Sequence, residues 1–136
     1  MCGVVGIFPS QGDLLERDFD CCEEMLRMLH HRGPDDASVV TDPTFCLGNT
    51  RLRILDLSQR ADLPMSNEDG SVWLAYNGEV TNFDSLRREH RLDDRFAMRT
   101  EGDTEVLLRL YESMGIDFVR LLTGQFAFIL MDLKKM

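Results

Sequence analysis

Hydrophobic and polar positions in the first part of the chain predict a strand followed by a helix. The apolar run from Gly3 to Phe8 is short, rich in Val and Ile, and ended by Pro9, as expected for a buried strand. Between residues 15 and 29, apolar side chains recur at helical spacing. This apolar stripe consists of Leu15, Phe19, Cys22, Met25, Leu26 and Leu29. The helix should end before His31-Arg32-Gly33-Pro34-Asp35, because Gly and Pro both interrupt helices.

The middle of the chain predicts a series of short strands. We expect strands at residues 38–41, 45–48, 51–57 and 71–76. The turn Asp42-Pro43 separates the first two, and Arg51 opens the third. Residues 59–70 are polar and contain Pro64, which predicts a loop. Asn77-Gly78-Glu79 should end the fourth strand at a tight turn.

The last third of the chain predicts two helices and a final strand. Asn82 is expected to cap a short helix. A longer helix follows residues 100–103 and should end at Gly115. Residues 126–133 are almost wholly apolar, which predicts a strand buried on both faces. Strands at both ends with helices between them indicate an α+β fold in which helices cover sheets.

Composition and charge narrow the class of protein. The 136 residues are enough for one domain, 1–136, and too few for two. Acidic residues exceed basic ones by 24 to 15, and the resulting net charge of -9 argues against a nucleic-acid partner. No apolar run reaches the roughly 20 residues of a membrane span, and no signal peptide is recognisable. We therefore expect a cytoplasmic protein without a membrane partner.

Cofactor and metal motifs are missing from the sequence. It contains no P-loop, no Gly-x-Gly-x-x-Gly segment and no Ser-Gly-Gly type pyrophosphate loop. His30 and His31 lack Cys, Asp or Glu at ligand spacing, and packing or capping of the following turn is their preferred interpretation. We expect neither a metal nor a cofactor in this chain.

Cys2 is the candidate nucleophile. Aminopeptidases remove Met1 when the next side chain is small, which makes Cys2 the first residue. An α-amino group has an ordinary pKa of about 7.7–8.0, so it can accept the thiol proton of the same residue. From position alone, a buried thiol at the start of a strand is an equally good interpretation. For Cys21, Cys22 and Cys46 we expect buried or half-buried small hydrophobic residues.

Other side chains suit the attack of a thiolate on a carbonyl group. A thiolate that attacks a carbonyl group creates an oxyanion, to which Asn77-Gly78 can donate from the side-chain amide and a backbone N–H. Arg51 and Asp103 can hold the two charged ends of an α-amino acid. Taken singly, each of these has a simpler interpretation. Asn77-Gly78 is then an ordinary turn, Arg51 a solvated charge at a strand end, and Asp103 a helix N-cap.

Five short segments carry a more specific signal than any single residue. They are Met1-Cys2-Gly3-Val4-Val5-Gly6-Ile7, His31-Arg32-Gly33-Pro34-Asp35, Arg51-Leu52-Arg53-Ile54, Tyr76-Asn77-Gly78-Glu79 and Gly102-Asp103-Thr104-Glu105. Their order resembles class II glutamine amidotransferase domains, which are N-terminal-nucleophile hydrolases. Residues 55–58, 64–70 and 124–128 are most similar to the glutamine-hydrolysing asparagine synthetases. The resemblance covers essentially the whole chain.

The resemblance implies a four-layer αββα sandwich and the hydrolysis of L-glutamine to glutamate and ammonia through a Cys2 thioester. It implies that Asn77 and Gly78 form the oxyanion hole, that Asp103 and Glu79 hold the α-amino group, and that Arg51 holds the α-carboxylate. The full set of implied binding residues is Arg51, Leu52, Arg53, Ile54, Leu55, Asn77, Gly78, Glu79 and Asp103. Ammonia then passes to a synthetase domain.

The chain departs from the family pattern in a few places. Val80-Thr81-Asn82 stands where Ile-Tyr-Asn is frequent, and Asn49 stands where His is common. Family domains continue beyond the position of Lys134-Lys135-Met136, so we expect a sandwich that is incomplete at its C-terminal end. A synthetase domain or a second chain is the expected partner that completes it. ATP and Mg²⁺ are expected only in that absent synthetase domain.

Two other functions stay open on the sequence. The chain is alternatively a truncated or split amidotransferase module with little activity, which binds a partner or glutamine. As a third interpretation, it is an N-terminal-cysteine hydrolase that acts on another amide, such as a peptide or a conjugated bile acid. The pair Arg51 and Asp103 favours a free amino acid as substrate.

Overall fold

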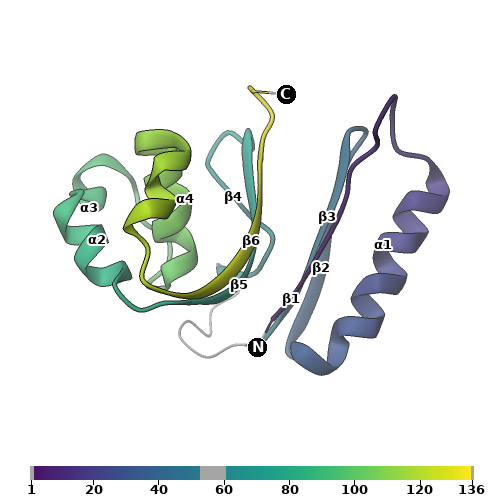
Figure 1. Cartoon of the computed structure of the whole chain (residues 1–136), viewed down its shortest axis with the longest axis horizontal. Helices are drawn as coiled ribbons and strands as arrows, with labels where there is room; N and C mark the ends of the chain where they lie inside the picture. Colours follow the sequence, from purple (N-terminus) through teal and green to yellow (C-terminus); the bar gives the residue numbers. More distant parts are fainter. Residues whose placement is uncertain (1, 53–60, 136) are drawn as a thin grey trace.

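Two three-stranded antiparallel sheets face each other in the computed structural model, which describes residues 2–52 and 61–135 (Figure 1). The first sheet has the order β1-β3-β2, with β1 at Gly3–Ile7, β3 at Phe45–Arg51 and β2 at Asp36–Asp42. The second has the order β4-β5-β6, with β4 at Met65–Ser66, β5 at Val72–Val80 and β6 at Gly124–Asp132.

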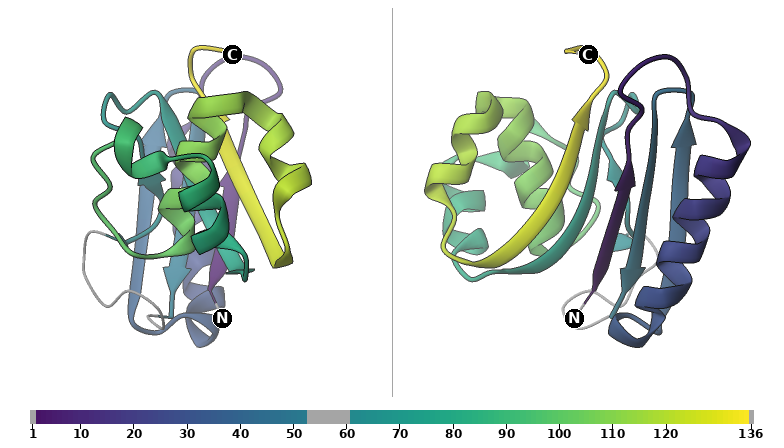
Figure 2. Two further views of the ribbon diagram at one scale, coloured as in Figure 1. Left: turned by 90° about the vertical axis from the view of Figure 1, so that its left-hand side faces the viewer. Right: turned by 45° about the vertical axis from the view of Figure 1, so that its right-hand side comes forward.

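Helices cover the outer face of each sheet, so that the chain forms four layers in the order α, β, β, α (Figure 2). On the first sheet lies α1, at Glu16–Leu29, which continues as a 3₁₀ turn at His30–Arg32. On the second sheet lie α2 at Phe83–Glu89, α3 at Leu92–Arg95 and α4 at Asp103–Met114, followed by a 3₁₀ helix at Gly115–Leu121. The predicted α+β sandwich is confirmed.

Three apolar clusters hold the layers together. The largest joins α4 to β5 and the 3₁₀ helix through Leu107, Leu74 and Phe118. A second lies between α1 and the first sheet, where Cys22 packs with Cys46. A third fills the space between the sheets around Leu47. These side chains are fully buried, and each leucine or phenylalanine among them contributes about 1.5–3 kcal/mol by leaving water.

The two longer helices lie where the apolar stripes predicted them. On α1, however, some residues of the predicted apolar stripe are exposed. Cys22 and Leu26 are buried, whereas Met25 is partly exposed and Leu15 lies just before the helix with more than half of its surface exposed. Cys21 is also exposed, which contradicts its expected burial. The sheet beneath α1 has three strands and is too narrow to cover the whole stripe.

Four local predictions were wrong. Arg51 ends β3 instead of opening a strand, and the rest of segment 51–57 lies outside the described residues from position 53. Strand β5 does not end at Asn77-Gly78-Glu79 but continues to Val80, because this segment pairs with β6. Strand β6 is half-buried, because it is the edge strand of its sheet in the described part of the chain.

The fourth error concerns Asn82, whose side chain makes no capping hydrogen bond to α2. It instead donates from Nδ2 to the carbonyl of Leu121 at 2.9 Å, and its Oδ1 accepts from the backbone N–H of Thr123 at 2.9 Å. Asn82, which the sequence indicates as a helix cap, thereby links the start of α2 to the segment before β6. Among the described helices, none has the length and apolar character needed to cross a membrane.

Candidate active site

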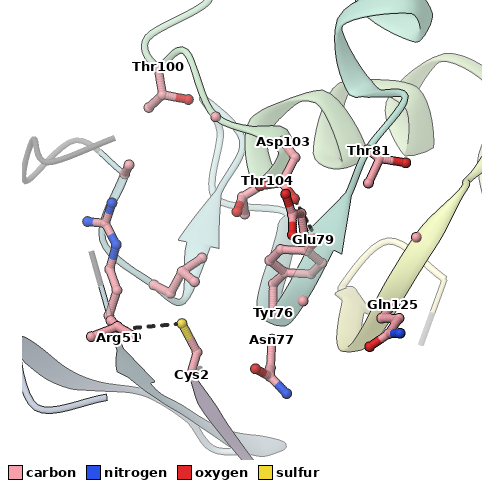
Figure 3. Close-up of a pocket in the computed structure, with 16 residues that line it drawn as sticks. Cys2, Arg51, Tyr76, Asn77, Glu79, Thr81, Thr100, Asp103, Thr104 and Gln125 are labelled. Atoms are coloured by element: carbon pink, nitrogen blue, oxygen red, sulfur yellow. Dashed lines mark hydrogen bonds between the residues drawn. The ribbon is translucent and has the colours of Figure 1, made fainter. Parts of the chain in front are cut away.

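A cavity of about 640 Å³ opens where the N-terminal end of β1 meets β5 and the start of α4 (Figure 3). Both sheets contribute to its walls, as does the segment before β4. Its lining consists of Cys2, Arg51, Leu52, Ala61, Leu63, Tyr76, Asn77, Gly78, Glu79, Thr81, Thr100, Gly102, Asp103, Thr104, Gly124 and Gln125. A volume of this size accommodates a small molecule.

Cys2 lies directly before β1, and its backbone is held from two sides. The side chain of Arg32 donates from Nε to the Cys2 carbonyl at 3.1 Å. The next residue, Gly3, donates its N–H to Oγ1 of Thr50 at 2.9 Å. The thiol faces the cavity, where the backbone N–H of Leu52 lies 3.5 Å from Sγ and supports negative charge on the sulfur (Figure 3).

The remaining cysteines are remote from this cavity. Cys22 and Cys46 are buried between α1 and β3, as expected, and Cys21 is exposed on α1. Burial raises the pKa of the Cys22 thiol to about 12, so this thiol stays protonated and unreactive near neutral pH. Cys2 is therefore the cysteine placed for chemistry.

Asn49 connects the two sheets beside Cys2. Its Nδ2 donates to the carbonyl of Gly3 at 2.9 Å and to the carbonyl of Tyr76 at 3.3 Å, and its Oδ1 accepts from the Tyr76 N–H at 2.8 Å. Asn49 is fully buried. Its amide therefore fixes the distance between the strand that carries Cys2 and the strand that carries Asn77.

Asn77 and Gly78 lie within β5, opposite Ala127 and Phe126 of β6. The Asn77 side-chain oxygen is buried and has no hydrogen-bond partner among the described residues. Leaving a buried acceptor unpaired costs about 1–3 kcal/mol, so this oxygen is available to a hydrogen-bond donor of a ligand. Any Cβ at Gly78 would lie 2.5 Å from the backbone oxygen of Gln125, so the close approach of β6 requires glycine.

Arg51 lies at the end of β3 and is only 6% exposed, which rules out the simple interpretation as a solvated charge. It forms an ion pair with Asp62. Its backbone packs tightly against the segment around Gly33. The N–H of Asp35 donates to the Arg51 carbonyl at 3.1 Å. A Cβ at Gly33 would lie only 2.6 Å from the backbone nitrogen of Arg51. The Gly33-Pro34-Asp35 turn therefore positions Arg51.

Asp103 is the first residue of α4 and is 5% exposed. The N-cap is Gly102, and the Asp103 carboxylate turns toward β5, so the interpretation as an N-cap is wrong. Its Oδ2 accepts from the Tyr76 hydroxyl at 2.6 Å and from the Val80 N–H at 3.0 Å. Figure 3 shows Asp103 and Arg51 on different walls of the cavity. One cavity is thus lined by a guanidinium that pairs with Asp62, by a carboxylate and by a thiol.

The structure brings most of the sequence-derived site residues together. The cavity is lined by Cys2, Arg51, Leu52, Asn77, Gly78, Glu79 and Asp103. The proposed contacts through Arg53, Ile54 and Leu55 lie outside the described residues. Sequence reasoning did not assign Tyr76, Thr100 and Gln125 to the site, although Tyr76 directly precedes Asn77-Gly78 and Gln125 lies in the segment 124–128.

Comparison with solved structures defines the class of fold. The chain is similar to glutamine phosphoribosylpyrophosphate amidotransferase from B. subtilis, with a TM-score of 0.74 over 96% of this chain and 35% of that chain, at 22% sequence identity. That protein has the fold of the N-terminal-nucleophile amidotransferases. The four layers described above, with a cysteine at the N-terminal end of the first strand, therefore form an N-terminal-nucleophile hydrolase fold.

The family follows from sequence comparison. A family model described as a glutamine amidotransferase domain matches residues 1–136, and this chain belongs to that enzyme family. It is 36% identical over 135 residues to asparagine synthetase B [glutamine-hydrolyzing] of Escherichia coli (strain K12), covering 99% of this chain and 24% of that protein. It is 39% identical over 132 residues to the asparagine synthetase [glutamine-hydrolyzing] of Asparagus officinalis, covering 97% of this chain and 22% of that protein. The chain thus spans about a quarter of the length of these relatives.

Proposed function

We propose that this chain hydrolyses the side-chain amide of L-glutamine to glutamate and ammonia. The observation that carries the proposal is the shared cavity of the Cys2 thiol, the Arg51 guanidinium and the Asp103 carboxylate. A free amino acid carries one negative and one positive group at its α-carbon, which matches Arg51 and Asp103. Its side-chain amide then extends toward the sulfur. The relatives named as glutamine-hydrolysing support the same substrate.

The reaction begins after Met1 is removed. The α-amino group of Cys2 accepts the thiol proton, and the sulfur attacks the amide carbon of glutamine. The oxyanion of the tetrahedral intermediate accepts hydrogen bonds from Asn77 Nδ2 and the Gly78 N–H. When the carbon–nitrogen bond breaks, the ammonium group of Cys2 returns the proton and ammonia leaves. Water then attacks the thioester, its proton passes to the amine, and glutamate is released with the thiol restored.

Substrate binding uses the cavity walls. Arg51 holds the α-carboxylate, next to Leu52. Asp103 and Glu79 hold the α-amino group. Because these contacts involve atoms that do not react, they favour binding of the substrate and the transition state alike.

The whole protein's reaction extends beyond this chain. We propose that the ammonia reaches a synthetase domain, or a second chain, that uses it to make asparagine, as the names of the relatives suggest. Amide hydrolysis by a thiol and an amine requires no metal or organic cofactor. ATP and Mg²⁺ would serve the synthetase reaction. We propose a cytoplasmic location on the sequence alone.

A glutaminase assay tests the proposal directly. The purified chain, shown by intact mass to lack Met1, is incubated with L-glutamine, and glutamate is measured against a parallel incubation with L-asparagine. We expect glutamate release from glutamine and little hydrolysis of asparagine, because the shorter side chain does not reach Cys2. A folded, processed chain that binds glutamine without releasing glutamate would contradict the proposal and identify a binding module.

Replacing Arg51 by Ala is expected to raise the KM for glutamine by about 10- to 100-fold with a smaller change in kcat. A hydrogen bond to a charged group contributes about 1.5–3 kcal/mol, and loss of binding common to ground and transition states appears in KM. The variant Arg51→Lys keeps the charge without the two-pronged geometry, so its KM should lie between those of the other two proteins. An unchanged KM in Arg51→Ala would show that the carboxylate is bound elsewhere.

A further inference from the structure

The Asp103 carboxylate is held through one of its two oxygens. Both hydrogen bonds that it accepts within the described chain end on Oδ2, from the Tyr76 hydroxyl at 2.6 Å and from the Val80 N–H at 3.0 Å. This arrangement leaves Oδ1 for a ligand in the cavity that Asp103 lines. The rotation of the carboxylate about its last side-chain bond is therefore set by these two donors.

The Tyr76 hydroxyl is a permanent donor in this position. Tyr76 is 3% exposed, and burial, together with the hydrogen bond to Asp103, raises the pKa of its hydroxyl far above the ordinary value. The hydroxyl therefore stays protonated near neutral pH. Its hydrogen bond to an anionic acceptor is of the strong, charge-assisted type.

The backbone of Tyr76 is also held in place by hydrogen bonds. Asn49 binds both the N–H and the carbonyl of Tyr76, at 2.8 and 3.3 Å. The same Asn49 amide binds the carbonyl of Gly3, next to Cys2. A chain of hydrogen bonds therefore runs from the nucleophile's strand through Asn49 and Tyr76 to Asp103, and it sets the position of the carboxylate relative to the thiol.

We propose that Tyr76 is a positioning residue that orients Asp103 toward the α-amino group of the substrate, an inference that rests on the proposed glutaminase function. Tyr76 does not touch the reacting atoms. It acts by binding Oδ2 so that Oδ1 faces the ligand. The hydroxyl thereby confers a preference for substrates that carry an α-amino group over amides of the same length that lack one.

The variant Tyr76→Phe removes the hydroxyl and keeps the buried ring. We expect the KM for L-glutamine to rise by about 5- to 20-fold and kcat to change by less than about twofold, because the loss affects binding at a non-reacting group. A role confined to packing would lower stability without this split between KM and kcat.

A second substrate separates positioning from general damage. The compound 4-carbamoylbutanoate is glutamine without the α-amino group, and we expect its kcat/KM to be the same in Tyr76→Phe and in the parent chain. The variant Asp103→Asn should also lose the preference for glutamine. In the double variant, the Tyr76→Phe change should have no further effect, since both residues act on the same group.

Tyr111→Phe is the matched control. The Tyr111 hydroxyl donates to Asp132 Oδ2 at 2.7 Å, so this variant loses the same kind of bond outside the cavity. Both variants are compared by urea unfolding. Equal losses of kcat/KM for the two substrates in Tyr76→Phe, or an unchanged KM for glutamine, would overturn the proposal.

Ligand binding distinguishes failure of this proposal from failure of the glutaminase function. The Cys2→Ala chain is titrated calorimetrically with L-glutamine and with 4-carbamoylbutanoate, with and without Tyr76→Phe. If the parent chain hydrolyses neither compound, the glutaminase function fails, but a binding preference for glutamine that Tyr76→Phe removes still supports positioning. If the preference is unaffected, or if neither ligand binds, the role of Tyr76 is overturned.

Discussion

Replacement of Cys2 by Ala should lower the rate of glutamate release from glutamine by at least about 10³-fold, with the fold and the affinity for glutamine retained. Loss of a nucleophile removes the covalent route, and the remaining binding and oxyanion contacts give only a small residual rate. The Cys2 side chain contributes little to the core, because it is only partly buried and points into the cavity. Glutamate release and calorimetric glutamine binding measure the two effects.

Cys21→Ala is the matched control for this prediction. Cys21 is exposed on α1, away from the cavity, so its removal should leave glutamate release within about twofold of the parent rate. A chain engineered to retain Met1 tests the amine separately, because it keeps the thiol but lacks a free α-amino group on Cys2. We expect this chain to be inactive. Substantial glutamate release from the Cys2→Ala chain would exclude the thioester route.

Replacement of Arg109 by Met should lower the free energy of unfolding by about 3 kcal/mol, because the buried carboxylate of Glu105 would keep only one guanidinium partner, that of the part-exposed Arg99 at 3.6 Å. Neither Arg109 nor Glu105 has exposed side-chain surface, and the Arg109 guanidinium lies 3.2 Å from Glu105. The same guanidinium also binds Glu112 at 2.8 Å and Glu68, and it stacks 5.0 Å above the Phe96 ring. Urea unfolding with linear extrapolation measures the loss.

An exposed ion pair of similar spacing provides the comparison for Arg109. Arg27 pairs with Glu24 one helical turn away on α1, and its side chain is 75% exposed. Arg27→Met should therefore cost less than about 1 kcal/mol. Equal destabilisation by the two substitutions would show that Arg109 is not acting through compensation of a buried charge.

The charged residues around Arg109 also help to hold a segment that lines the cavity. Glu105, the partner of Arg109, accepts hydrogen bonds from the N–H groups of Arg99 and Thr100, at 2.8 and 2.7 Å, and from the Thr100 hydroxyl at 2.9 Å. Thr100 lines the cavity two residues before the N-cap of α4. The charge cluster therefore fixes the segment that leads to Asp103, and a glutaminase assay on Arg109→Met is expected to show a raised KM together with the lower stability.

Sequence patterns predicted the main helices and the residues around the cavity because both have local signatures. Apolar residues at helical spacing mark α1 and α4, and short runs of characteristic residues mark Cys2, Asn77-Gly78 and Asp103. Asn49 lacked such a signature, and Tyr76 was marked only by its place beside Asn77-Gly78, because each makes its decisive hydrogen bonds to partners at least 27 positions away. The functional roles of all these residues stay predictions until the variants are measured.

The sequence by itself determined which groups are available: a thiol that processing can free, a side-chain amide, a guanidinium and carboxylates, together with the helices and strands that carry them. The tertiary structure alone decided their use. The local turn signal at Asn77-Gly78 was overridden when β6 paired with that segment, and the charge of Arg51 at the end of β3 is buried and paired with Asp62. Local propensities are worth about 1 kcal/mol or less per residue, whereas pairing with a strand about 50 residues away changes hydrogen bonding and burial along a whole segment.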